Sequence, residues 1–238
     1  MVISHTGGII QAIVKITSIE PQKKKLDRVN VFIDGRFAFG LSQALRFENK
    51  LEVGQEISES RIKELVEKDQ IERLFNKALR FLSYRPRSEK EITDHLLRKG
   101  KLLDLKSEDE VAQYNESVEK TIKNLKRLDQ VDDDAFAKWW IEQRLKFKPQ
   151  AIGVIKRELL AKGIDQDVIE ETIGAVKKAE GTGDEDLALR AAEKKLISYK
   201  NLGPEDFKIK MGRYLARKGF SWEVIKKVVD SFLEKRVK

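Results

Sequence analysis

The sequence predicts a mainly α-helical chain in which three tandem three-helix repeats form an elongated arc, preceded by a small N-terminal β-hairpin or three-strand region. Three observations support this fold class. Apolar residues alternate around an Asp-Gly pair near the N-terminus, the apolar spacing changes to about 3.6 residues after residue 58, and a segment ending in Lys-Gly occurs three times. The expected regions are 1–57 (β-rich), 58–71 (connecting helix), 72–131 (repeat 1, with an insertion near 102–113), 132–180 (repeat 2) and 184–238 (repeat 3).

The N-terminal region predicts a hairpin because an Asp-Gly pair lies between two alternating apolar runs. Asp-Gly is typical of a type I′ turn, in which both central residues need a positive φ. The alternating residues of the hairpin are Val29, Val31, Ile33, Phe37, Phe39 and Leu41, and those of a third strand are Ile10, Ala12, Val14 and Ile16. This region is too small for a large core and is expected to pack on the helix that follows.

The repeats are recognised by the glycines Gly100, Gly163 and Gly219, each preceded by lysine and, four residues earlier, by leucine. A lysine near the end of a helix, followed by glycine, predicts a helix end with a left-handed cap. A proline stands at a similar distance before each glycine and is expected in the first turn of a helix. These prolines are Pro86, Pro149 and Pro204.

Composition favours a binding protein of a reducing compartment. The 238 residues contain 48 Lys and Arg, 40 Asp and Glu and no cysteine, so a disulfide framework and a thiolate metal site are excluded. The net charge of +8 favours a polyanionic or acidic partner. No apolar run is long enough to span a membrane. We therefore expect a cytoplasmic monomer.

No motif for catalysis occurs: the phosphate-binding loop, the nucleophile elbow and the zinc-protease helix are all missing from the sequence. We expect no enzyme activity, no cofactor and no metal. Asp132, Asp133 and Asp134 could bind a metal, but they are better explained as an N-cap and acidic first turn. Trp139 and Trp140 could stack on bases, but core or inter-repeat packing is favoured.

Basic residues recur near the end of the first helix of each repeat. They are either solvated helix ends or a basic stripe that binds phosphates or carboxylates. Arg144 differs from the others because it falls inside the apolar arc, where it either extends toward solvent or pairs with a buried carboxylate. The candidate partner- or DNA-binding residues are Arg80, Arg85, Arg87, Arg144, Lys146, Lys148, Lys194, Lys195 and Lys200.

Several spaced motifs, taken in order, resemble those of the RecX family of recombination regulators over about residues 72–236. The N-terminal region resembles the extension of longer members. The turn of the second repeat departs from the family, which usually has glycine where this chain has Phe147-Lys148-Pro149. The motifs are Ala78-Leu79-x-x-Leu82-x-x-Arg85-Pro86-Arg87-Ser88-x-x-Glu91, Leu128-x-x-Val131-x-Asp133-x-x-Phe136-Ala137 with Arg144, Ile155-x-x-Glu158-Leu159-x-x-Lys162-Gly163-Ile164 and Leu215-x-x-Lys218-Gly219-Phe220.

This resemblance implies a bacterial protein that binds the RecA recombinase filament on DNA. Family members modulate its ATP hydrolysis, strand exchange and coprotease function, and so act in homologous recombination, DNA repair and the SOS response. Some members also bind single- or double-stranded DNA. The alternative is a stand-alone DNA-binding helical-repeat module, and the residues alone do not rank these two functions.

Overall fold

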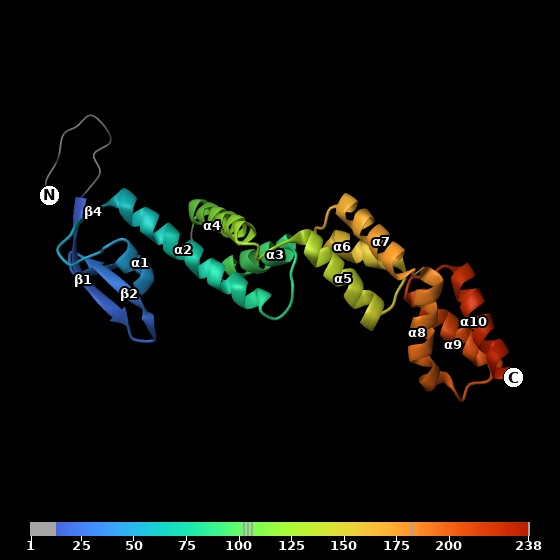
Figure 1. Cartoon of the computed structure of the whole chain (residues 1–238). Coiled ribbons are helices and arrows are strands. Elements are labelled where there is room, and N and C mark those ends of the chain that lie inside the picture. Colours follow the sequence, from blue (N-terminus) through green and yellow to red (C-terminus); the bar gives the residue numbers. More distant parts are fainter. Residues whose placement is uncertain (1–12, 102, 104, 106, 182, 238) are drawn as a thin grey trace. The chain divides into compact units, whose positions relative to one another are not determined.

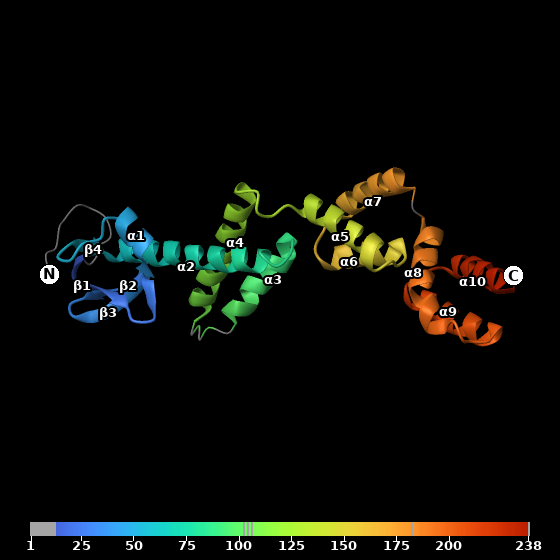
Figure 2. The same cartoon turned by 60° about the horizontal axis from the view of Figure 1, so that its bottom comes forward.

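The computed structural model describes residues 13–101, 103, 105, 107–181 and 183–237. The chain divides into two compact units (Figures 1 and 2). One unit comprises residues 1–81 and 95–127, and the other comprises 82–94 and 128–238. A small N-terminal sheet followed by helices confirms the expected mainly α fold with three-helix repeats. The elongated arc stays a prediction.

The first unit begins with a four-stranded antiparallel sheet of order β3-β2-β1-β4, one strand more than expected. Asp34 and Gly35, with φ values of 49° and 76°, form the predicted turn between β2 and β3. Ile10 and Ala12 lie outside the described residues. The three-residue β4, which pairs with β1, is too short to give an alternating pattern. The strands are β1 (Ile13–Gln22), β2 (Lys25–Ile33), β3 (Arg36–Ser42) and β4 (Glu56–Ser58).

A buried carboxylate joins this sheet to the helices α1 (Gln43–Glu48) and α2 (Glu59–Leu82). Asp69 of α2, only 3% exposed, accepts two hydrogen bonds from the Arg28 guanidinium, at 2.9 and 2.7 Å. The backbone N–H of Ser42 donates to the same carboxylate at 3.0 Å. Because α2 is continuous, it includes both the expected connecting helix and the first helix of repeat 1.

The helices α3 (Glu89–Gly100) and α4 (Glu108–Arg127) complete repeat 1. The start of α4 shows that the second half of the expected insertion belongs to a helix. The left-handed cap predicted at Gly100 is wrong, because this residue is still helical. A Cβ on Gly100 would lie 2.3 Å from the Tyr114 ring, so here glycine makes room for an aromatic side chain of α4.

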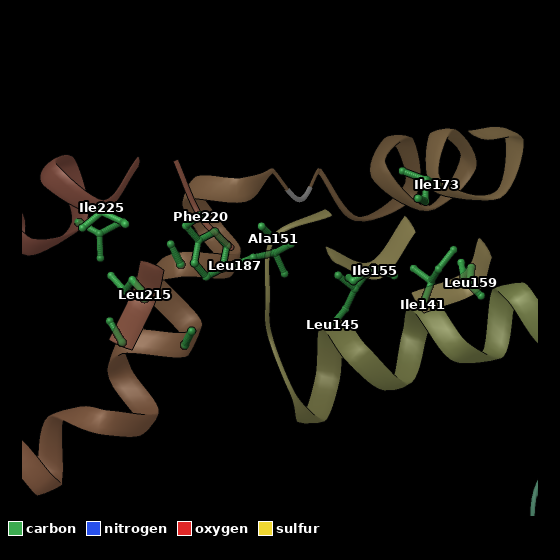
Figure 3. Close-up of a cluster of buried hydrophobic side chains, with 14 of the residues drawn as sticks. Ile141, Leu145, Ala151, Ile155, Leu159, Ile173, Leu187, Leu215, Phe220 and Ile225 are labelled. Atoms are coloured by element: carbon green, nitrogen blue, oxygen red, sulfur yellow. The ribbon is translucent and has the colours of Figure 1, made fainter. Parts of the chain in front are cut away.

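Repeats 2 and 3 lie in the second unit and share one hydrophobic core, part of which is drawn in Figure 3. Asp132 is the N-cap of the first helix of repeat 2, since its carboxylate accepts from the N–H groups of Asp134 and Ala135, both at 2.9 Å. This confirms the capping interpretation. The helices are α5 (Asp133–Phe147), α6 (Ile152–Ala161) and α7 (Gln166–Glu180), then α8 (Asp184–Tyr199), α9 (Pro204–Arg217) and α10 (Trp222–Val237).

Repeats 1 and 2 are joined where the start of α3 meets repeat 2. The Ser88 hydroxyl donates to the carbonyl oxygen of Lys162 at 2.7 Å. The backbone N–H of Glu89 donates to the Asp133 carboxylate at 2.8 Å. An acid of repeat 2 thus caps the positive end of a repeat 1 helix.

Repeats 2 and 3 are joined by two hydrogen bonds at corresponding positions. The backbone N–H of Ala151 donates to the carbonyl oxygen of Lys218 at 3.0 Å, and that of Ile152 donates to the Asp184 carboxylate at 2.9 Å. The N-cap residue of α6, Ala151, makes no side-chain capping hydrogen bond, and the Asp184 carboxylate caps the helix instead. Ala151 lies in the close-up of the shared core beside Phe220, which follows the Lys218-Gly219 turn (Figure 3).

The glycines of these two junctions are left-handed, as predicted, with φ values of 82° at Gly163 and 83° at Gly219. Each also allows a close approach. A Cβ would lie 2.7 Å from Lys90 Cβ at Gly163 and 2.2 Å from Val154 Cγ2 at Gly219. The start of α3 packs against Gly163, and the start of α6 packs against Gly219. Both left-handed turns therefore occur where a helix of the preceding repeat packs on a glycine.

The prediction for the prolines holds at Pro204, the first residue of α9. It is wrong for Pro86 and Pro149, which precede α3 and α6 in the connecting loops. The residues between each of these prolines and its helix include Ser88 and Ala151, which make the junction hydrogen bonds. These stretches are not helical, and they contact the next repeat.

We predict that Gly219→Ala destabilises the second unit by about 2 kcal/mol or more, because it combines a left-handed backbone with a steric overlap. Gly174→Ala, inside α7 with open space around its Cα, is the matched control and should stabilise by up to about 1 kcal/mol. All three tryptophans lie in the second unit, so denaturation followed by tryptophan fluorescence reports on it. Equal stabilities of the two variants would contradict the close packing of α6 on Gly219.

Candidate polyanion-binding surface

The predicted basic residues occupy different settings. Arg80 lies in the last turn of α2 in the first unit, and the others lie in the second unit. Arg85 and Arg87 follow the end of α2, so they belong to a loop and not to a helix end. Lys146 and Lys148 lie at the end of α5, as expected. Of the third group, Lys194 and Lys195 lie within α8 and Lys200 is its C-cap.

Arg144 pairs with a half-buried carboxylate, which is one of its two expected arrangements. Its Nε donates to Glu158 Oε2 at 2.6 Å, and its guanidinium lies over the Trp140 ring, 4.2 Å from the centroid. Trp140 Nε1 donates to the same Glu158 oxygen at 2.9 Å. Burial alone would raise the pKa of Glu158, but hydrogen bonds from Arg144, Gln150 and Trp140 lower it.

Arg85 is also held by a carboxylate. Its two terminal nitrogens donate to Glu91 at 2.9 and 2.8 Å, and Lys162 Nζ donates to Glu91 at 2.6 Å. The Lys162 ammonium lies 4.1 Å from the centroid of the Trp140 ring. We call this group the Trp140 cluster; its members are Arg85, Glu91, Trp140, Arg144, Glu158 and Lys162.

The Trp140 cluster neutralises most of its own charge. Burial would raise the pKa of Glu91, but the bonds from Arg85 and Lys162 outweigh it and lower the pKa to about 2. Both tryptophans are half-buried and pack against the core, so the packing role expected for Trp139 and Trp140 is confirmed. Arg85 and Arg144 therefore hold repeat 2 together and join it to the start of α3.

A second group of cations lies where repeats 2 and 3 meet. Lys194 Nζ donates to the carbonyl oxygens of Lys146 and Phe147, both at 3.1 Å, and so caps the end of α5. Lys195 lies 5.8 and 5.9 Å from the ring centroids of Tyr199 and Tyr214, and Lys218 lies 5.7 Å from that of Tyr214. We call this group the lysine cluster; its members are Lys148, Lys194, Lys195 and Lys218.

The lysine cluster differs from the Trp140 cluster in its balance of charge. Burial lowers the pKa of Lys218, and repulsion from Lys148, Lys194 and Arg144 lowers it further, whereas Glu158 raises it. Within the described part of the chain, none of the four lysines forms an ion pair with a carboxylate. Their charge is therefore available to an external anion, which makes this the candidate polyanion-binding surface.

Sequence reasoning treats Lys218 only as part of the Lys-Gly signature and does not single out Tyr199 or Tyr214. The available signal is a lysine and a tyrosine four residues apart, which occurs at Lys195 and Tyr199 and again at Tyr214 and Lys218. A further basic group in the first unit is also missed. There the pKa of Lys77 is lowered first by burial and then by its neighbours Arg73, Lys99 and Lys25, which come from separate elements.

Comparison with known proteins gives consistent matches along the chain. Models of the regulatory protein RecX match its N-terminal domain at residues 14–58 and its three successive three-helix domains at 75–101, 132–173 and 183–229. The chain is 32% identical over 221 residues to "Regulatory protein RecX" of Clostridium tetani, covering 92% of this chain and 94% of that protein. It is 33% identical over 215 residues to the protein of the same name from Bacillus subtilis, covering 90% of this chain and 76% of that protein.

Among solved structures, one described as the crystal structure of regulatory protein RecX aligns with a TM-score of 0.60 at 27% identity. The alignment covers 91% of this chain and 99% of that one. The similarity therefore includes the N-terminal sheet region as well as the helical repeats.

We predict that Glu91→Gln lowers the free energy of unfolding at pH 7 by on the order of 2 kcal/mol, because Arg85 and Lys162 lose a shared, largely buried anion. The folded-state pKa of about 2 is below the ordinary value of 4.5. This stabilisation is therefore complete above about pH 4.5 and is lost as pH falls toward 2. Thermal unfolding over a pH series should show the difference between parent and variant shrinking below pH 4.5.

Glu170→Gln is the matched control, because Glu170 pairs with Lys156 at an exposed site. It should change stability by less than about 1 kcal/mol. If Glu91→Gln behaves like this control, the Trp140 cluster does not stabilise the junction of repeats 1 and 2.

Proposed function

The chain belongs to the RecX family of regulatory proteins, and from this premise we propose that it binds the filament of the RecA recombinase on DNA and lowers its ATPase, strand-exchange and coprotease activities. The observation that carries the proposal is the series of four RecX domains that are matched in order along one chain. Each three-helix domain is matched in order, and the matches cover 94% of one RecX relative and 76% of another.

The arrangement of repeats 2 and 3 supports action by binding. Their six helices share one core, so they present neighbouring surfaces as one body. Stacked repeats of this kind suit contact along an extended partner. The relatives are named as regulators, and we propose that this chain likewise acts without catalysis, cofactor or metal, as a monomer in the cytoplasm. In the part of the chain that the structure describes, no helix is long and apolar enough to cross a membrane.

A second function, DNA binding by the chain alone, is favoured by one specific observation. The lysine cluster holds four cations with no carboxylate paired to them among the described residues, next to two half-buried tyrosines. Cations beside aromatic rings are typical of surfaces that bind single strands. Both functions can coexist, because a filament partner offers DNA as well as protein.

We predict that the purified chain lowers RecA-dependent ATP hydrolysis on single-stranded DNA at less than one molecule per RecA subunit. The physical reason is that a protein of several repeats spans more than one subunit of a filament. Steady-state ATPase measured while the chain is titrated in tests this, with the chain alone as the control for its own hydrolysis. A need for stoichiometric saturation, or an unchanged ATPase, would rule out the filament-binding proposal.

A second arm of this experiment separates the two functions. Excess free single-stranded DNA, added after inhibition is established, should leave most of the inhibition in place if the chain binds the filament. Complete reversal would show that the chain acts by sequestering DNA and would favour the stand-alone DNA-binding module.

A further inference from the structure

The two repeat junctions can be compared residue by residue because corresponding hydrogen bonds build them, although the donor to the lysine carbonyl is the Ser88 hydroxyl at the first and the Ala151 backbone N–H at the second. Ser88 and Ala151 occupy equivalent positions, and each donates to the carbonyl oxygen of the equivalent lysine, Lys162 or Lys218. The capping acids Asp133 and Asp184 are equivalent in the same way. These hydrogen bonds set the register for every other residue at the two sites.

In this register, a cationic side chain occupies each of three equivalent positions at both junctions. Lys148 stands at the position of Arg85, three residues before the junction donor. Lys218 stands at the position of Lys162. Counting from the capping acids, Lys195 stands at the position of Arg144. Lys194 is an additional cation, held by carbonyl groups at the end of α5.

The carboxylates, in contrast, are replaced. Val154 stands at the position of Glu91, and Tyr214 stands at the position of Glu158. At the first junction these two acids form ion pairs with all three cations of the Trp140 cluster. At the second junction Lys148, Lys195 and Lys218 keep the three cationic positions and Lys194 adds a fourth charge, and among the described residues none of the four forms an ion pair with a carboxylate.

This arrangement is unfavourable for the protein alone. Lys218 is half-buried against the Tyr214 ring, and the charges of Lys148 and Lys194 repel it, which lowers its pKa. The carboxylate whose charge reaches Lys218 is Glu158, and it is already bonded to Arg144 and Trp140. An anion from outside would relieve the repulsion.

The chemistry of the side chains favours phosphate over a protein carboxylate. Lys148 and Lys195 replace Arg85 and Arg144, and their ammonium groups act as point charges that can contact a phosphate oxygen without bidentate geometry. The Tyr199 and Tyr214 rings lie beside the Lys195 ammonium group, and the Tyr214 ring also lies beside that of Lys218. The bases of a nucleic acid strand can stack on such rings, whereas the carboxylates of an acidic peptide cannot.

We propose that the lysine cluster binds the phosphodiester backbone of a single nucleic acid strand, with a phosphate taking the place that the Glu91 and Glu158 carboxylates hold at the first junction. The proposal deepens the proposed function by assigning the DNA contact of the filament-bound chain to the junction of repeats 2 and 3. Binding to a free strand tests it without RecA, so the two proposals can fail separately.

The test restores the missing carboxylate. Val154→Glu places an acid where Glu91 stands at the other junction, so it should neutralise Lys148 and Lys218 from within. We expect this variant to bind a fluorescein-labelled oligothymidylate about tenfold more weakly than the parent at low salt, measured by fluorescence anisotropy. The slope of log affinity against log salt should fall by about 0.7 for each phosphate that the variant no longer neutralises.

Val154→Gln is the matched control, since it has the same size and no charge, and it should bind like the parent. Equal affinity and equal salt slope of the Val154→Glu and Val154→Gln variants would overturn the proposal. So would a Val154→Glu variant that binds the oligonucleotide normally but no longer inhibits RecA, because the cluster would then face an acidic protein surface.

A second pair of variants covers the case in which Val154→Glu does not fold. Lys148→Ala combined with Lys218→Ala should weaken oligonucleotide binding to a similar extent. Lys138→Ala combined with Lys178→Ala removes two exposed lysines from α5 and α7 and should not. Equal weakening in both double variants would show a diffuse effect of net charge and overturn the assignment to the cluster.

Discussion

The helical part of this protein depends on one contact, in which the start of a helix packs on the Lys-Gly turn of the next repeat. The lysine carbonyl accepts a hydrogen bond from the preceding repeat, and the left-handed glycine gives the room for it. An aspartate at the start of the next repeat caps the same helix. Because these bonds satisfy backbone groups that a helix end leaves unpaired, they position the repeats as well as stabilise them.

The same packing of a helix start on a Lys-Gly turn is surrounded by different charged side chains at its two occurrences. At the first junction, Glu91 and Glu158 neutralise the surrounding cations and leave Trp140 packed between repeat elements. At the second, a valine and a tyrosine replace the two acids, and the positive charge stays on the surface. A structural ion-pair network and a binding surface thus come from equivalent positions of one repeat.

The sequence predicts the parts of this structure that depend on local pattern. The Asp34-Gly35 turn, the Asp132 cap and the left-handed Gly163 and Gly219 all follow from residue preferences over a few positions. The shared Lys-Gly pair alone does not distinguish Gly100, but the next residue does: Lys101 follows Gly100, whereas an apolar residue, Ile164 or Phe220, follows each left-handed glycine. Among these three glycines, Gly163 and Gly219 receive a helix start of the preceding repeat, which a local pattern does not predict.

The roles of the basic residues also depend on contacts that a local sequence pattern cannot predict. In the sequence Arg85 resembles the other basic residues, and neither its partner Glu91 nor the Glu158 partner of Arg144 can be identified before folding brings them together. Lys162 meets Glu91 across 71 positions of the chain, a distance at which no spacing rule applies. Arg144 stands out in the sequence only because it interrupts an apolar helix face. Lys218 does not stand out as a binding residue, because its role in the Lys-Gly signature already explains it.

Amide hydrogen exchange at Ala151 and Ile152 tests the junction most directly. First-turn amides of a helix usually have no partner within the helix and exchange quickly. Here both N–H groups are bonded to repeat 3, so they should exchange as slowly as the core amides of α6, such as that of Ile155. Fast exchange at Ala151 and Ile152, with Ile155 still protected, would contradict the account.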